Sequence, residues 1–336
     1  MTTKKNKRPT LQHVADKVGV TKMTVSRYLR DPKQVSEQLR SVIESAVEEL
    51  GYIPNRAPDI LSNAKSHAIG VLVPSLTNHV FAEVIRGIET ELEPSGYQTM
   101  LAHYGYSPLA EESRIATLLS YNVDGLILSE SVHTERVRKM LSVAGVPVIE
   151  IMDSVLPPLE QAIGINNEAA ARDMTELMIS KGRKHIVYLA ARMDERTQQK
   201  IRGYEAAMLR ANLQPKSLQT VDASSFTMGA KLLLDAIREN PQTDGLFCTN
   251  DDLAIGALYE CQRQGIAVPE QISIAGFHGH DITKAMIPRL ATVVTPREEM
   301  GRQAAAQMMA RLNGAPIEQK IIELPYYLEV GQSLGG

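Results

Sequence analysis

From Ala68 onward, short apolar runs alternate with helical segments, and this alternation limits the folds that the chain can adopt. Four runs, AIGVLV, YQTMLA, GLILS and PVIEI, are followed later by four more, HIVYLA, LQTVDA, GLFCT and ISIAGF. Segments such as HVFAEVIRGIETEL, AARDMTELMISKG and DLAIGALYECQRQG lie between the runs and have helical composition. Strands that alternate with helices form parallel sheets with right-handed crossovers. The 336 residues exceed one compact core, so the pattern predicts two α/β lobes, each with a doubly wound parallel sheet.

The first fifty residues follow a different, all-α pattern. Thr10 can cap a first helix and Thr21 a second one, TKMTVSRYLR, and Gly19 supplies the turn between them. Ser36 opens a third helix. The apolar residues of the first and third helices recur at helical spacing, as Leu11, Val14, Ala15 and Val18 and as Leu39, Val42, Ile43, Ala46 and Leu50. This arrangement predicts a helix-turn-helix head.

The head is also basic. Residues 1–40 hold ten Lys and Arg against three acidic residues, a net charge of +7, so the remainder carries −10 because the whole chain carries −3. A basic head on an acidic body indicates a polyanionic partner, although charge alone would also fit a solvated basic tail. The second helix favours DNA as this partner, because one of its faces is basic and polar and carries no acidic residue. This face consists of Lys22, Met23, Ser26, Arg27 and Arg30.

Side-chain chemistry assigns expected roles at the DNA. Lys22 and Arg27 can donate to guanine acceptors, and Met23 can contact a thymine methyl group. Hydroxyl groups are better suited to phosphates, which set the register: Thr10, Thr21, Thr24, Ser26 and Ser36. Thr24 and Ser26 have an alternative role as capping or solvating residues of the helix.

The stretch LQHVADKVGVTKMTVSRYLRDPKQVSEQLRSVIESAVEELGYIPN resembles the DNA-binding head of the LacI/GalR family of bacterial repressors, and the resemblance continues through the whole chain. It implies operator DNA as partner, a homodimer, and a body similar to periplasmic sugar-binding proteins. It also implies a helix-turn-helix domain at 1–54, a hinge helix or linker at 55–66 and an effector-binding and dimerisation domain at 67–336. The first lobe of the body is expected at about 67–162 plus 295–322, and the second at about 163–294 plus 323–336.

The hinge carries a residue of special interest. In the family this segment becomes helical on operator DNA and a leucine wedges into the minor groove, a position that Leu61 occupies here. Asn55 can cap this helix. Pro58 stands where the best-known members carry alanine, but a first-turn proline breaks no helical hydrogen bond. A plain flexible linker is the alternative.

No enzymatic motif is present. GxSxG, P-loop, GxGxxG and HExxH patterns are absent, so we expect neither an enzyme nor a bound cofactor. Cys248 and Cys261 form no CxxC and read as two reduced thiols. The stretch FHGHD places His278 and His280 beside an aspartate, but further ligands at metal-binding spacing are missing.

Ligands of doubly wound sheets bind beyond the carboxyl ends of strands. The resemblance assigns sugar hydroxyls to Asp153 and Asn250 and an apolar wall to Phe81, and Ser75 lies at another strand end. Where many relatives carry arginine, aspartate and glutamine, this chain has Lys200, His278 and Thr295. Together with Arg196, these changes favour an anionic effector such as gluconate, whose carboxylate the cations would bind. In the alternative, His278 packs in the core and His280 faces solvent.

We therefore expect a transcriptional repressor of genes for the uptake and catabolism of a sugar acid. Its effector closes the two lobes and disorders the hinge helices. The alternative hypothesis is a sugar-binding or sensor protein of the same fold that responds to idonate, ketogluconate or a neutral sugar. The start MTTKKNKRPT leads into no apolar segment, and no apolar run approaches the roughly 20 residues of a membrane span, which favours a cytoplasmic protein. No leucine heptad follows Gly331, which favours dimers over tetramers.

Overall fold

The computed structural model describes residues 8–55 and 65–335, which belong to two compact units, Met1–Ser66 and His67–Gly336. Leu61 and Pro58 lie outside the described residues, so the expectations about the hinge wedge and its proline remain predictions. Within the described ranges, no helix is both long and apolar enough to cross a membrane.

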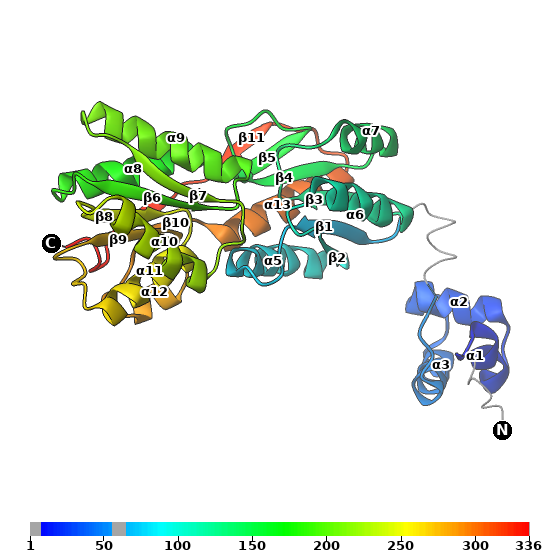
Figure 1. Cartoon of the computed structure of the whole chain (residues 1–336). Coiled ribbons are helices and arrows are strands. Elements are labelled where there is room, and N and C mark those ends of the chain that lie inside the picture. Colours follow the sequence, from blue (N-terminus) through cyan, green and yellow to red (C-terminus); the bar gives the residue numbers. More distant parts are fainter. Residues whose placement is uncertain (1–7, 56–64, 336) are drawn as a thin grey trace, which may run out of the picture. The chain divides into compact units, whose positions relative to one another are not determined.

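The described part of the first unit, residues 8–55, is a bundle of three α-helices, α1 (Leu11–Val18), α2 (Lys22–Arg30) and α3 (Glu37–Leu50), with a 3₁₀ turn, η1 (Pro32–Gln34) (Figure 1). Gly19 ends α1 with φ 76°, the left-handed conformation that a tight turn needs. Thr21 and Ser36 accept backbone N–H bonds as the N-caps of α2 and α3. The core consists of Val14, Ala15, Val25, Ile43, Ala46 and Tyr52. The predicted helix-turn-helix is confirmed.

One expected core residue of the head is exposed. Val42 keeps 47% of its surface accessible, whereas its neighbour Ile43 is fully buried. Successive residues of an α-helix point about 100° apart, so both cannot face the narrow core of a three-helix bundle. The pattern therefore placed α3 correctly but assigned it too wide an apolar face.

The first lobe of the body is a six-stranded sheet in the order β11-β5-β4-β3-β1-β2, in which every paired neighbour is parallel. Its strands are β1 (Ala68–Val73), β2 (Gln98–His103), β3 (Gly125–Leu128), β4 (Val148–Asp153), β5 (Gln161–Ile165) and β11 (Ile321–Glu323). Its helices are α5 (His79–Leu92), η2 (Glu93–Ser95), α6 (Pro108–Ser120), α7 (Glu135–Ala144) and α13 (Arg297–Leu312).

The second lobe repeats this plan with the order β12-β10-β9-β8-β6-β7, and only β12 runs antiparallel to its neighbour. Its strands are β6 (Ile186–Ala191), β7 (Lys216–Thr220), β8 (Gly245–Cys248), β9 (Ser273–His278), β10 (Ala291–Val294) and β12 (Tyr327–Glu329). Its helices are α8 (Asn167–Ser180), α9 (Glu195–Arg210), α10 (Phe226–Glu239), α11 (Asp251–Gln264) and α12 (Ile282–Ala285). The expected two-lobed α/β body is confirmed.

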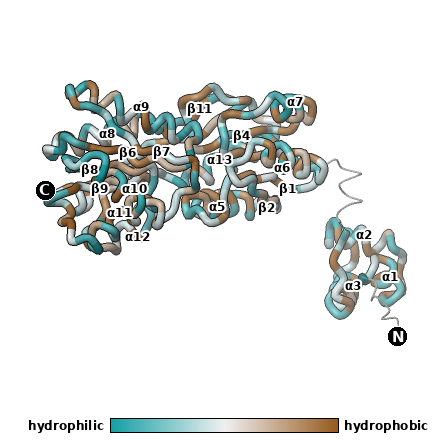
Figure 2. Tube along the Cα trace, viewed as in Figure 1, coloured by the Kyte–Doolittle hydropathy of each residue, from teal (hydrophilic) through white to brown (hydrophobic). Residues whose placement is uncertain are grey.

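Helices on both faces of each sheet explain the apolar runs of the sequence. Strands β1, β3, β4, β6, β8 and β9 are buried along their whole length, whereas the edge strands β2 and β7 are not. In Figure 2, brown hydrophobic residues gather along inner strands such as β6, whereas the outer helices alternate teal and brown residues. The chain crosses between the lobes after β5, β10 and β11. The expected first boundary at residue 162 falls inside β5, so the structure places this crossing after Ile165.

Two glycines allow α13 to return to the first lobe at very short range. A Cβ atom on Gly87 of α5 would lie 2.1 Å from the Glu298 carbonyl oxygen, and one on Gly301 of α13 would lie 2.1 Å from that of Val84. The two backbones therefore meet at positions where no side chain fits. This close crossing brings Arg297, at the start of α13, to Glu83. Arg297 donates two hydrogen bonds to the Glu83 carboxylate, with N–O distances of 3.1 and 2.9 Å.

Candidate functional site

A pocket opens where the carboxyl ends of strands from both lobes meet. The first lobe contributes Asn78, Val80, Phe81, Tyr106 and Met152, and the second contributes Ala191, Arg192, Asp194, Arg196, Thr197, Lys200, Thr249, Asn250 and His278. Of the expected effector-binding residues, the structure thus brings together Phe81, Arg196, Lys200, Asn250 and His278. Ser75 and Asp153 are not among the lining residues.

Lys200 and His278 form the buried floor of this pocket. The Lys200 ammonium group lies 3.1 Å from the Thr249 carbonyl oxygen and 3.3 Å from Nε2 of His278, and it sits 3.8 Å above the Phe277 ring. Burial lowers the pKa of Lys200 to about 7, and the charges of Arg196 and Arg192 act in the same direction against Asp194 and Asp251. The lysine is therefore poised to change its charge near neutral pH.

His278, the other residue of the pocket floor, is neutral. Burial, followed by the charges of Lys200 and Arg297, lowers its pKa well below the usual 6.5. A neutral imidazole can accept a hydrogen bond from Lys200 at Nε2 and donate one from Nδ1 to Thr295 Oγ1, which lies 3.4 Å away. A neutral His278 therefore positions Lys200.

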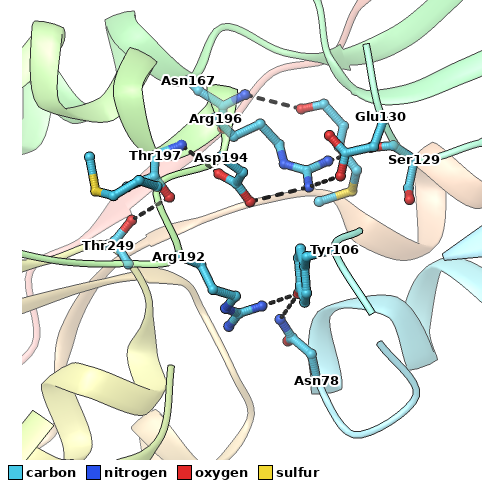
Figure 3. Close-up of polar contacts among 12 residues, drawn as sticks. Asn78, Tyr106, Ser129, Glu130, Asn167, Arg192, Asp194, Arg196, Thr197 and Thr249 are labelled. Atoms are coloured by element: carbon cyan, nitrogen blue, oxygen red, sulfur yellow. Dashed lines mark hydrogen bonds and ion pairs between the residues drawn. The ribbon is translucent and has the colours of Figure 1, made fainter. Parts of the chain in front are cut away.

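Arg196 connects the two lobes (Figure 3). From α9 of the second lobe it reaches Glu130 of the first lobe at 3.1 Å and also donates to the carbonyl oxygen of Ser129. Asp194, the N-cap of α9, lies 3.6 Å away on the other side. The pKa of Asp194, which burial alone would raise, is lowered by Arg196 and by the Thr197 N–H. The charge of Arg196 is therefore largely satisfied by the protein itself.

A second interlobe contact, between an arginine and a tyrosine, lies nearby. Arg192, directly after β6, donates to the hydroxyl of Tyr106, and its guanidinium carbon lies 4.4 Å from the centre of the tyrosine ring. The Asn78 amide also donates to this hydroxyl (Figure 3), at a distance of 3.5 Å. Arg192 was not among the expected site residues. Its position at a strand's carboxyl end was the signal that could have found it.

The polar residues expected to hold hydroxyl groups differ in their availability. Asn250 uses its side-chain oxygen to cap α11 and to accept from Ser224 at 2.7 Å, so its NH₂ group is left to donate. Both oxygens of Asp153 are engaged at 2.8 Å, by the Val155 N–H and by the Gln199 side chain. Ser75 accepts N–H bonds that shape the loop carrying Asn78. Direct effector contacts by Asp153 and Ser75 stay predictions.

The other histidine of FHGHD is structural. His280 is only 5% exposed, and its ring packs edge-on against His79 with centroids 5.8 Å apart, so it does not face solvent. Its backbone N–H donates to Asp251, which also accepts from Thr292 at 2.6 Å. Within the described residues, no group of three or more His, Cys, Asp or Glu side chains is arranged to hold a metal ion.

In the head, the expected base-contacting residues Lys22, Met23 and Arg27 are exposed on α2, and Met23 keeps 71% of its surface accessible. A single exposed apolar side chain does not by itself mark a contact surface, so the base contact of Met23 stays a prediction. The hydroxyl residues play local roles as well: Thr24 and Thr21 lie 3.0 Å apart, and Thr10 binds His13 through its backbone N–H. Thr10, Ser36 and Asn55 are exposed, whereas Ser26 is half-buried.

Two family models together match nearly the whole chain. Residues 10–55 match the model for bacterial regulatory proteins of the lacI family. Residues 66–330 match the model for periplasmic binding proteins and the sugar binding domain of the LacI family. The chain belongs to the LacI family. It is therefore a DNA-binding transcriptional regulator in which a helix-turn-helix head is joined to a sugar-binding-type body.

Individual LacI-family relatives agree with this assignment along the full chain. The HTH-type transcriptional regulator GntR of Escherichia coli K12 is 58% identical over 98% of this chain and 100% of its own length. IdnR of the same organism is 45% identical with the same coverage. The crystal structure of a LacI-family transcriptional regulator from Silicibacter pomeroyi superposes with a TM-score of 0.91 at 32% identity, covering 97% of this chain and 99% of its own.

Proposed function

We propose that this regulator is a homodimeric repressor that binds a palindromic operator and leaves it when a sugar acid, gluconate or a close relative, occupies the pocket between the lobes. The observation that carries the proposal is the charge of the pocket. Arg192, Arg196 and Lys200 all line it, whereas Asp194 is the only acidic residue among its described lining. A polyhydroxy acid matches such a pocket because its carboxylate meets cations and its hydroxyls meet amide and hydroxyl groups.

The two-lobed architecture explains how binding would reach the DNA. The pocket takes residues from both lobes, so a bound effector stabilises one relative position of the lobes over others. A change in how the first lobes of a dimer meet would then alter the hinge segments and the paired heads. By thermodynamic linkage, operator binding must weaken effector binding by the same factor. The pocket is built for binding, and we infer no catalysis in it.

The proposal is tested by operator release. Purified full-length protein on operator duplex is titrated with gluconate, idonate, ketogluconate, glucose and galactose in gel-shift assays, and each compound is also titrated into DNA-free protein by calorimetry. We expect a sugar acid to bind more tightly than either neutral sugar and to release the operator. Release by a neutral sugar alone would instead support the alternative hypothesis, a neutral-sugar sensor of the same fold. No binding by any compound would refute the effector class.

Base reading by the head is tested with Arg27→Ala. The Arg27 side chain is exposed on α2 and can donate two hydrogen bonds to a guanine. Its loss should cost about 1–3 kcal/mol on operator and much less on scrambled duplex. Gel shifts on both duplexes measure the difference, with Lys33→Ala on the 3₁₀ turn as a control for lost charge. Equal losses on the two duplexes would show that Arg27 contacts phosphate and reads no base.

A further inference from the structure

The three cations of the pocket differ in what already neutralises them. Arg196 lies against Glu130 at 3.1 Å and Asp194 at 3.6 Å. Lys200 has no carboxylate within ion-pair distance among the described residues, but it is fully enclosed by the Thr249 carbonyl, His278 and the Phe277 ring. The buried charge of Arg196 thus already has its counter-ions, and an incoming carboxylate would have to compete with Glu130 for it.

Arg192 is in a different situation. No carboxylate of the described residues lies within 4.0 Å of its guanidinium group, and its one side-chain hydrogen bond goes to the neutral Tyr106 hydroxyl. A guanidinium group has five N–H donors in a planar fork that matches a carboxylate. Arg192 is half-buried and lines the pocket, so most of its donor capacity remains for a ligand.

The backbone around Arg192 supports a role in binding. Seven described residues other than glycine have positive φ, and four of them line this pocket: Tyr106 (60°), Met152 (83°), Arg192 (53°) and His278 (106°). Such backbone conformations are energetically unfavourable, and they cluster at ligand sites. The Arg192 backbone is held on both sides, by an N–H bond to the Asp222 carbonyl at 3.1 Å and by the Asp194 N–H at 2.6 Å.

We infer that Arg192 binds the carboxylate of the effector, assisted across the cleft by the Tyr106 hydroxyl. The inference rests on the proposed sugar-acid function and names the residue that selects for the acid. In the structure the phenol oxygen accepts from Arg192 and from Asn78, so its own proton is free to be donated to a carboxylate oxygen. Arg192 comes from the second lobe and Tyr106 from the first, so the carboxylate bridges both lobes. Arg196 then remains paired with Glu130 of the other lobe, and Lys200 adds positive charge on the pocket floor beneath the carboxylate.

The test separates recognition of the carboxylate from recognition of the polyol chain. Gluconate and glucitol differ only in that a CH₂OH group replaces the carboxylate. Both are titrated by calorimetry into the wild type and into full-length Arg192→Met, Arg192→Lys and Tyr106→Phe. The matched control is Arg202→Met, because Arg202 on α9 is 46% exposed and pairs with Glu168 and Glu195 away from the pocket lining. Operator binding without effector confirms that each variant is folded.

We expect Arg192→Met to weaken gluconate about 10–100-fold, the loss of a charge-assisted bidentate contact, and to change glucitol by less than about threefold. Arg192→Lys should recover part of the loss, Tyr106→Phe should cost several-fold, and Arg202→Met should leave both affinities unchanged. Unchanged gluconate affinity in Arg192→Met, or equal losses for gluconate and glucitol, would overturn the inference and leave the proposed function standing. A wild type that binds no sugar acid would remove the proposed function itself.

Discussion

A chain that begins at His67 is expected to lose operator binding altogether and to keep the effector affinity of the full-length protein. The truncation removes the first compact unit, which contains the exposed basic face of α2 and all of the expected DNA contacts. Residues 1–40 carry a net charge of +7, so non-specific attraction to DNA is lost as well. The loss should therefore exceed the factor of about 10³ that typically separates specific from non-specific binding.

The pocket should survive this truncation, because all of its described lining residues lie between Asn78 and His278. Gel shifts measure the first effect, and calorimetry with a sugar acid measures the second. Thermal unfolding of the truncated chain shows whether residues 67–336 fold alone, as their own cores imply. A truncated protein that still shifts operator DNA would place DNA contacts in the body and refute the division of labour between the two units.

The sequence predicts the fold correctly where the hydrophobic periodicity is strong. The helix expected at HVFAEVIRGIETEL is α5, His79–Leu92, and the run AIGVLV is β1, Ala68–Val73. The strands that were not expected, β5, β10, β11 and β12, are three to five residues long. Such segments hold their conformation by pairing with distant strands, as Ile321 does with Ala162, so local pattern does not identify them.

The site was readable in part. His278 and Asn250 could be placed in the pocket because each lies at the carboxyl end of a predicted strand. The charge states in the pocket, however, depend on partners that are distant in the sequence. Arg196 is neutralised by Glu130, 66 residues earlier, and His278 is held neutral beside Lys200, 78 residues earlier. Judged from the sequence alone, Arg192 and Arg196 are equivalent cations. Only the tertiary arrangement distinguishes the paired Arg196 from the available Arg192.

Affinity for a sugar acid is expected to fall as the pH rises above about 7, and Lys200 should be the cause. Burial lowers the pKa of Lys200 to about 7 in the effector-free pocket, so near neutral pH the ammonium form is only partly populated. A bound carboxylate favours the charged form and offsets the repulsion from Arg192, so it raises the pKa and binding takes up a proton. Affinity is then highest below pH 7 and falls by up to about tenfold per unit between the free and the bound pKa.

The measurement is calorimetric titration with gluconate from pH 6 to 9, repeated in buffers of different ionisation enthalpy so that proton uptake is counted directly. Lys200→Met should weaken gluconate about 10–100-fold at pH 6, because the positive charge beneath the bound carboxylate is lost, and should abolish the pH dependence. His278→Gln is the discriminating control. The pKa of His278 lies well below 6.5, so this histidine stays neutral over the range, and its replacement should alter the affinity but preserve the slope. A slope that survives in Lys200→Met, or vanishes in His278→Gln, would assign the titration to the imidazole and contradict the charge state derived for the pocket floor.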